Sequence, residues 1–135
     1  ADARFIRVMP NTACLVGEMA AAFSKGKNAT EKDAKTAKTI LDSAGISFEM
    51  QEEDLDVVTG LSGSGPAFFA HMIRSMSEQA QEMGLEKDTA LKLAAKTCLG
   101  TGKLLLDKGM SPDELISMIS SPNGTTLAGL ESMEN

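Results

Sequence analysis

The spacing of apolar residues changes once along the chain, near Gln51, and this change constrains the fold more than any other feature. Three short apolar segments of strand length precede it, at residues 5–9, 16–23 and 46–50. A single helical pattern lies among them, over residues 30–44, and beyond Gln51 apolar residues recur only at helical spacing. We therefore predict a mainly α fold with a small α/β portion. Strand, strand, helix and strand should fill residues 1–50, and helices alone residues 51–135.

Several helix ends can be predicted from local residue types. Thr30 is a suitable N-cap residue, with acidic side chains in the turn that follows it. Gly45 stands where a left-handed C-cap residue would belong. Pro66 suits a first helical turn, and residues 111–114, Ser-Pro-Asp-Glu, have the pattern of a capping box.

Composition excludes several classes of protein. The chain has 135 residues, of which 42% are hydrophobic, and a net charge of −6. This charge argues against a nucleic-acid surface, which requires clustered Lys and Arg side chains. No apolar run is long enough for a membrane span. The two cysteines, Cys14 and Cys98, lack metal-ligand spacing, so we expect no metal site and a reduced, cytoplasmic location.

The helical pattern over residues 87–107 is apolar on several sides. Leu91, Leu99 and Leu105 mark one face, whereas Leu93 and Leu104 lie off it. A helix of this kind must be covered on several sides, which roughly eighty residues of helix do not easily achieve. We expect a second copy of the chain to supply the cover, as a homodimer or a higher homo-oligomer. The alternative is the central helix of a monomeric bundle.

The first motif that could carry chemistry is LSGSGPA, residues 61–67. Free N–H groups at a helix start can bind an anion, and Gly, Ser and Ala let two backbones approach closely. From the residues alone, close helix packing is the preferred interpretation. The motif is not a dinucleotide fingerprint, because G-x-G is followed here by proline.

The second motif is SSPNGTT, residues 120–126. Asn123-Gly124 tolerates positive φ, so the chain can curl and direct successive N–H groups inward. Thr125 or Thr126 would then cap a helix whose positive dipole end faces the same space. Such a loop holds a carboxylate or phosphate without Arg or Lys. An ordinary turn with a threonine cap explains the residues equally well.

The third motif is Met9-Pro10-Asn11, which ends the first predicted strand. In open α/β sheets, ligands bind at the carboxyl ends of the strands. The alternative is a simple transition from strand to turn. His71, the single histidine, has no orienting carboxylate or cysteine nearby in the sequence, and we interpret it as a packing or surface residue.

Four longer stretches occur in the order RVMPNTACLVGE, VVTGLSGSGPAFF, AAKTCLGTGKLLL and SSPNGTTLAGLE. Together they closely resemble the pyrroline-5-carboxylate reductase family, and the likeness covers nearly the whole chain. That family reduces 1-pyrroline-5-carboxylate to L-proline with NADPH or NADH, the last step of proline biosynthesis. The resemblance implies an NAD(P)H-dependent oxidoreductase, with an N-terminal Rossmann domain, an all-helical dimerisation domain and active sites at the dimer interface.

The resemblance also implies a domain organisation. Residues 1–50 resemble the C-terminal part of the Rossmann domain, and residues 51–135 resemble the helical dimerisation and substrate-binding domain without its final helix. The family's opening strand and glycine-rich dinucleotide loop have no counterpart here, so we expect a fragment that is inactive alone. The alternative is a helical dimerisation module of another imine or β-hydroxyacid dehydrogenase. The chain departs from the family at Ala13-Cys14, where Pro-Ala is usual, and at Asn123-Gly124, where Gly-Gly is usual.

Site residues follow from the resemblance. The family loop that binds the substrate carboxylate corresponds to residues 120–126, and the strand end near the nicotinamide corresponds to residues 9–11. We infer that the Thr126 hydroxyl is the catalytic group and forms a hydrogen bond with the ring nitrogen. The expected substrate-binding residues are Ser121, Asn123, Gly124, Thr125 and Thr126. The expected cofactor-binding residues are Met9, Pro10 and Asn11.

Overall fold

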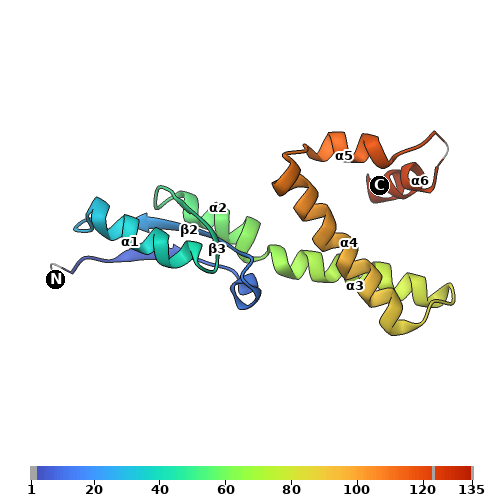
Figure 1. Ribbon diagram of the computed structural model, residues 1–135, viewed down its shortest axis with the longest axis horizontal. Helices are drawn as coiled ribbons and strands as arrows, with labels where there is room; N and C mark the ends of the chain where they lie inside the picture. The colour runs from blue at the N-terminus through green and yellow to red at the C-terminus, as the bar shows by residue number, and fades with distance from the viewer. Residues whose placement is uncertain (1–2, 123, 135) are drawn as a thin grey trace. The chain divides into compact units, whose positions relative to one another are not determined.

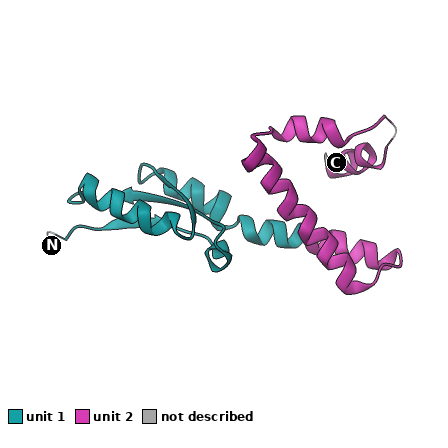
Figure 2. Cartoon of the chain, viewed as in Figure 1, with its two compact units in different colours: residues 1–72 teal, residues 73–135 magenta. Residues whose placement is uncertain are grey.

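The structure, a computed structural model, describes residues 3–122 and 124–134. It contains two compact units, residues 1–72 and residues 73–135, and the boundary falls inside one helix (Figure 2). The predicted division into domains at residue 50 stays a prediction.

The first unit contains a three-stranded sheet in the order β1-β2-β3 (Figure 1). Its strands are β1 (Ile6–Met9), β2 (Met19–Lys25) and β3 (Gly45–Glu49). β1 and β2 are antiparallel, whereas β2 and β3 are parallel and are connected by α1 (Glu31–Asp42). The predicted order of strand, strand, helix and strand is confirmed. The second strand starts at Met19 rather than Val16, because Val16 ends a 3₁₀ helix, Thr12–Val16, that Gly17 caps.

The core of this unit lies around β2. Residues 21–24 are all buried, and successive side chains of a strand point to opposite faces, so both faces of β2 are covered. The contacts come from α1 and from α2 (Asp54–Val58), whose Leu55 side chain is 0% exposed. This core supports the C-terminal end of β1, where the third motif lies.

Thr30 is the N-cap of α1, as predicted, and the structure adds a capping box with Asp33. The Thr30 hydroxyl accepts the Asp33 N–H at 3.3 Å, and the Asp33 carboxylate accepts the Thr30 N–H at 2.8 Å. The Thr30 hydroxyl also donates to that carboxylate at 2.7 Å. The backbone bond from Thr30, followed by the hydroxyl bond, lowers the pKa of Asp33 below its usual value.

This lowered pKa predicts an acid-sensitive contribution to stability. In the unfolded chain Asp titrates near pH ~3.9. Because the folded pKa is lower, the carboxylate stabilises the fold above that pH, and the contribution is lost as the pH falls through the folded pKa. Asp33→Asn should therefore lower the urea midpoint of unfolding at pH 6. The difference in midpoint between the variant and the unsubstituted protein should become smaller below about pH 4. A gap of constant size from pH 6 to pH 3 would contradict the assignment.

The predicted role of Gly45 as a helix C-cap is wrong. The C-cap of α1 is Ser43, in the right-handed conformation, and Gly45 instead opens β3 with a φ of 156°. Gly45 pairs with Met19 of β2, and a Cβ atom at Gly45 would overlap the Met19 backbone. Close approach of two strands, rather than the end of a helix, therefore requires glycine here.

All regular structure described after residue 51 is helical, as predicted. A π-helical turn, Thr59–Gly63, follows α2 and leads into α3 (Gly65–Glu82). The remaining helices are α4 (Lys87–Lys108), α5 (Pro112–Ile119) and α6 (Thr125–Glu134). Pro66 lies in the first turn of α3, and Ser111 and Glu114 form the predicted capping box of α5. Within the described ranges, no helix has the length and apolar character needed to cross a membrane.

Candidate functional site

Two of the three sequence motifs meet in the first unit. Asn11, just beyond the end of β1, donates from Nδ2 to the Ser62 carbonyl at 3.1 Å. Its Oδ1 accepts the N–H of Ala20 in β2 at 3.2 Å. The side-chain amide therefore connects the end of the β1–β2 pair to the π-helical turn of the LSGSGPA motif.

A second contact joins the same two segments. The methyl group of Met9 lies against Gly63, so close that a Cβ atom at Gly63 would overlap it. The glycine in this part of the motif therefore serves close packing, which was the interpretation preferred from the residues alone. The packing partner is a strand end rather than a second helix.

An open pocket of about 410 Å³ lies where these segments meet. Its lining residues are Asn11, Ala13, Ala20, Leu61, Ser62, Gly65, Pro66 and Phe69. None of these side chains is charged, and most are apolar. Such a surface suits a flat, uncharged ring that carries a few polar groups, and it does not suit a phosphate. Of the predicted cofactor residues, Asn11 lines the pocket, Met9 packs on Gly63, and Pro10 is exposed.

The third motif, SSPNGTT, belongs to the second unit. α5 ends at Ile119, and the Ser120 N–H still donates to Ile116 at 2.9 Å. The Gly124 N–H donates to the Ser121 carbonyl at 2.9 Å, which closes the turn. Asn123, a predicted substrate residue, lies outside the described residues.

The expectation that Thr125 or Thr126 caps the following helix is wrong. α6 begins at Thr125, so both threonines lie inside its first turn. The Gly124 carbonyl accepts the Ala128 N–H at 3.5 Å, which assigns the cap position to Gly124. Since glycine has no side chain, no side chain at the cap position competes for the first N–H groups of the helix.

The start of α6 therefore has the features of an anion site. The N–H groups of Thr125, Thr126 and Leu127 occupy the first turn, where an α-helix offers no acceptor of its own. The positive end of the helix dipole lies at the same place. No residue of the stretch 120–126 carries an ionisable side chain. A bound carboxylate would be held by backbone donors and hydroxyl groups.

One polar group in this loop was not singled out from the sequence. The Ser120 hydroxyl is buried and has no hydrogen-bond partner among the described residues. A buried hydroxyl without a hydrogen bond is less stable than a hydrated one. A ligand that forms a hydrogen bond with it would therefore be stabilised there. The sequence signal was present only as a repeated serine, Ser120-Ser121, which does not tell which hydroxyl is buried.

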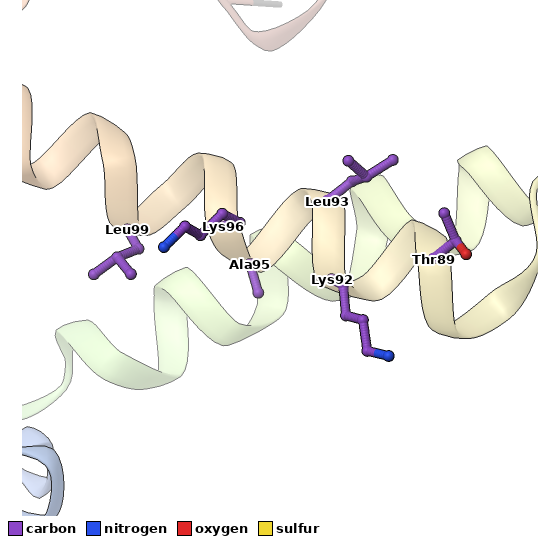
Figure 3. A pocket seen from close by; sticks show the side chains of 6 residues that line it. All are labelled: Thr89, Lys92, Leu93, Ala95, Lys96 and Leu99. Carbon is purple, nitrogen blue, oxygen red and sulfur yellow. The ribbon is translucent and has the colours of Figure 1, made fainter.

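The apolar residues of α4 remain largely uncovered within the described chain. A groove of about 620 Å³ runs along this helix, lined by Thr89, Lys92, Leu93, Ala95, Lys96 and Leu99 (Figure 3). Leu93 is 57% exposed and Leu99 is 45% exposed. Figure 3 shows Leu93 and Lys92 pointing to different sides of α4.

Over residues 3–122 and 124–134, no group of three or more His, Cys, Asp or Glu side chains could hold a metal ion.

Comparison with known proteins identifies relatives of the whole chain. A family model described as pyrroline-5-carboxylate reductase dimerisation matches residues 52–135. A pyrroline-5-carboxylate reductase of Methanosarcina acetivorans is 47% identical over 131 residues, which make up 97% of this chain and 48% of that relative. Pyrroline-5-carboxylate reductase 1 of Bacillus subtilis is 39% identical over 129 residues, 96% of this chain and 43% of the relative. The chain thus spans about half the length of the curated relatives it matches.

Solved structures agree with these relatives. A pyrroline-5-carboxylate reductase from Coxiella burnetii superposes with a TM-score of 0.92 at 29% identity, over 98% of this chain and 50% of that chain. A pyrroline carboxylate reductase of Plasmodium falciparum, solved with NADP bound, superposes with a TM-score of 0.89 at 34% identity. The superposition covers 97% of this chain and 53% of that chain. The resemblance drawn from the four sequence stretches is confirmed. On its family match and its fold, the chain belongs to the pyrroline-5-carboxylate reductase family.

Proposed function

We propose that this chain is the C-terminal part of a reductase that converts 1-pyrroline-5-carboxylate to L-proline with NADPH or NADH, the last step of proline biosynthesis. The observation that carries the proposal is the start of α6, where backbone donors and hydroxyl groups gather without a charged side chain. This start lies within residues 52–135, the region that matches the family. The relatives that share it bear the name of the reductase.

The substrate carboxylate binds at the start of α6. N–H groups of the first turn, at Thr125 and Thr126, donate to its oxygens, and the bare Gly124 backbone lets the anion approach closely. Ser121 adds a hydroxyl from the preceding turn. We assign Asn123 to the same loop on the family resemblance. Hydrogen bonds to a charged acceptor are among the stronger ones, so this loop fixes the orientation of the substrate ring.

The Thr126 hydroxyl forms a hydrogen bond with the ring nitrogen of the imine. Reduction requires positive charge on this nitrogen, so a positioned hydroxyl assists by holding it and its proton in place. No acidic side chain occurs in residues 120–126, and the loop therefore contributes positioning rather than strong acid catalysis.

The pocket at Asn11 and Ser62 accommodates the nicotinamide end of the cofactor. Its uncharged and mostly apolar lining suits a dihydronicotinamide ring. NADPH or NADH, when bound, supplies the hydride for the reduction. Asn11 lines this pocket from the strand end, and we assign Met9 and Pro10 to cofactor binding on the family resemblance. The sequence contains no G-x-G-x-x-G turn for the cofactor phosphates, so we expect this chain to be inactive by itself.

The Thr126 assignment predicts a defined loss of activity in the complete reductase that contains this chain. Thr126→Ala removes one hydrogen bond to a charged or developing-charge group, which is worth about 1.5–3 kcal/mol. The value of kcat/KM for the imine should therefore fall roughly ten- to a hundredfold. Thr126→Ser is the matched control and should retain most activity, because it keeps the hydroxyl. Steady-state oxidation of NADPH measures both variants.

Other results would reject this role. If Thr126→Ala reduces the imine normally and only melts at a lower temperature, Thr126 is a structural residue of α6. If the unsubstituted complete protein oxidises a β-hydroxyacid instead of reducing the imine, the chain belongs to another type of dehydrogenase.

A homodimer is the second part of the proposal. The leucines of α4 that are exposed in the single chain lie on more than one side of the helix, with Leu93 and Leu99 both lining the groove, and a second copy covers them. The family model that matches this region is described as a dimerisation domain.

A further inference from the structure

Regular backbone hydrogen bonding ends on both sides of the Asn11 pocket. On the strand side, the antiparallel ladder of β1 and β2 ends where Met9 lies opposite Ala22. Continued in the same register, the ladder would set Asn11 opposite Ala20 and offer the Asn11 carbonyl to the Ala20 N–H, but that carbonyl accepts the Cys14 N–H at 3.3 Å. The Ala20 N–H then finds its acceptor in the side chain of Asn11, at 3.2 Å, instead of in a strand backbone.

On the helical side, the missing group is a donor. In a regular helix the Ser62 carbonyl would accept the N–H of the residue four positions later, and that residue is Pro66. The next N–H, of Ala67, donates to the Ser64 carbonyl at 3.0 Å. The Asn11 amide supplies the donor to Ser62, at 3.1 Å. The Asn11 side chain thus supplies the donor that Pro66 lacks and, through its oxygen, an acceptor for the Ala20 N–H.

We propose that Asn11 is the positioning residue of this pocket: its amide bridges Ala20 and Ser62, holds the π-helical turn Thr59–Gly63 on the strand end, and so sets the site for hydride transfer. This inference rests on the proposed function. Ala20 and Ser62 both line the pocket, so the bridge joins two of its walls directly. The contact of Met9 with Gly63 supports the same junction.

The chemistry of the amide explains why it acts through other residues. A side-chain amide has two N–H donors and a carbonyl oxygen with two lone pairs. In Asn11 one donor and one lone pair are committed to the protein backbone. The π-helical turn is a short irregularity between α2 and α3, and the bond from Asn11 to Ser62 ties it to the strand end. Displacement of this turn would move the pocket wall, and small misplacements are costly for a reaction that depends on alignment.

Two variants of the complete reductase separate the two halves of the bridge. Asn11→Asp keeps an acceptor for the Ala20 N–H and loses the donor to Ser62, whereas Asn11→Ala loses both. Asn28→Ala is the matched control, because Asn28 is exposed in a surface turn. Amide hydrogen exchange is measured at Ala20 and over residues 59–65. The amides of residues 59–65 should exchange faster in both variants, whereas the Ala20 amide should exchange faster only in Asn11→Ala.

Kinetics then test the positioning role. We expect kcat for the imine to fall by about tenfold to a hundredfold in Asn11→Asp and Asn11→Ala. The dissociation constant of NADPH, from fluorescence titration, should change less than about threefold, because the pocket holds only one end of the cofactor. Asn11→Asp should melt at a lower temperature than the unsubstituted reductase, because its carboxylate has no proton to donate to the Ser62 carbonyl, so kcat is compared at a temperature at which both proteins are folded.

Each remaining outcome overturns part of the inference. Unchanged exchange over residues 59–65 in both variants would overturn the bridge. Faster exchange with normal kcat would reduce Asn11 to a structural residue. A weaker NADPH complex with normal kcat would assign Asn11 to direct cofactor binding. If the unsubstituted protein does not reduce the imine, the proposed function fails, while hydrogen exchange still tests the bridge by itself.

Discussion

Replacing Gly124 with valine in the complete reductase is expected to lower kcat/KM for the imine by about a hundredfold to ten-thousandfold. The substitution should cost about two backbone N–H donors to the substrate, and each such hydrogen bond is worth ~1.5–3 kcal/mol. A Cβ atom at Gly124 would lie 2.5 Å from the Ser121 hydroxyl oxygen and 3.0 Å from the Ser121 carbonyl oxygen. The first distance is too short for a carbon atom and the second is tight, so the Ser121 side chain must turn away and its backbone must shift by a few tenths of an ångström. The first N–H groups of α6 would then move away from the substrate carboxylate.

Gly129→Val is the matched control for this prediction. Gly129 lies in the same helix, and a Cβ atom there meets nothing within 4 Å in the described chain. We expect near-normal kinetics from it, and a binding constant for NADPH that is unchanged in both variants. Normal imine reduction by Gly124→Val, with only a lower melting temperature, would mean that the loop terminates a helix and does not bind substrate.

The second large effect concerns assembly. The chain should sediment as a dimer at micromolar concentration, and the double variant Leu93→Asp/Leu99→Asp should sediment as a monomer. Each buried leucine contributes about 1.5–3 kcal/mol, and an aspartate in the same place adds the free-energy cost of burying a charge. The dissociation constant should therefore rise by at least about a hundredfold.

Val57→Asp is the control for the assembly prediction. Val57 is 71% exposed on α2, in the first unit, so its substitution adds a charge without altering the face of α4. If the double variant still sediments as a dimer, the interface lies elsewhere than on α4. An unsubstituted chain that is monomeric and melts cooperatively would favour the self-contained bundle.

Helix starts could be predicted from the sequence because the groups that form them are neighbours. Thr30 with Asp33, and Ser111 with Glu114, satisfy backbone N–H groups across four consecutive residues, and both boxes occur in the structure. The change of period near Gln51 likewise depends on spacing within each element. Gly45 was misassigned because its local context fits a helix end, whereas its true constraint is Met19 on a neighbouring strand.

The candidate loop was partly predictable for the same reason. The small and hydroxyl residues of SSPNGTT indicate a turn with open N–H groups, which the structure contains. The cap position at Gly124 and the buried Ser120 hydroxyl were not predicted. Both depend on how the loop enters α6 and on what surrounds α5, and residue type alone does not specify either.

By itself, the sequence determined the class of fold, the family and the three motifs, because periodicity, capping and motif order are properties of neighbouring residues. Only the tertiary structure decided that Met9-Pro10-Asn11 and LSGSGPA form one pocket. The loss of an N–H at Pro66 can be deduced from the sequence, but the donor that replaces it comes from Asn11. That side chain lies 51 positions before Ser62 in the chain. Backbone groups left unpaired by a proline need a partner, and which partner reaches them depends on how the sheet and the π-helical turn pack in space.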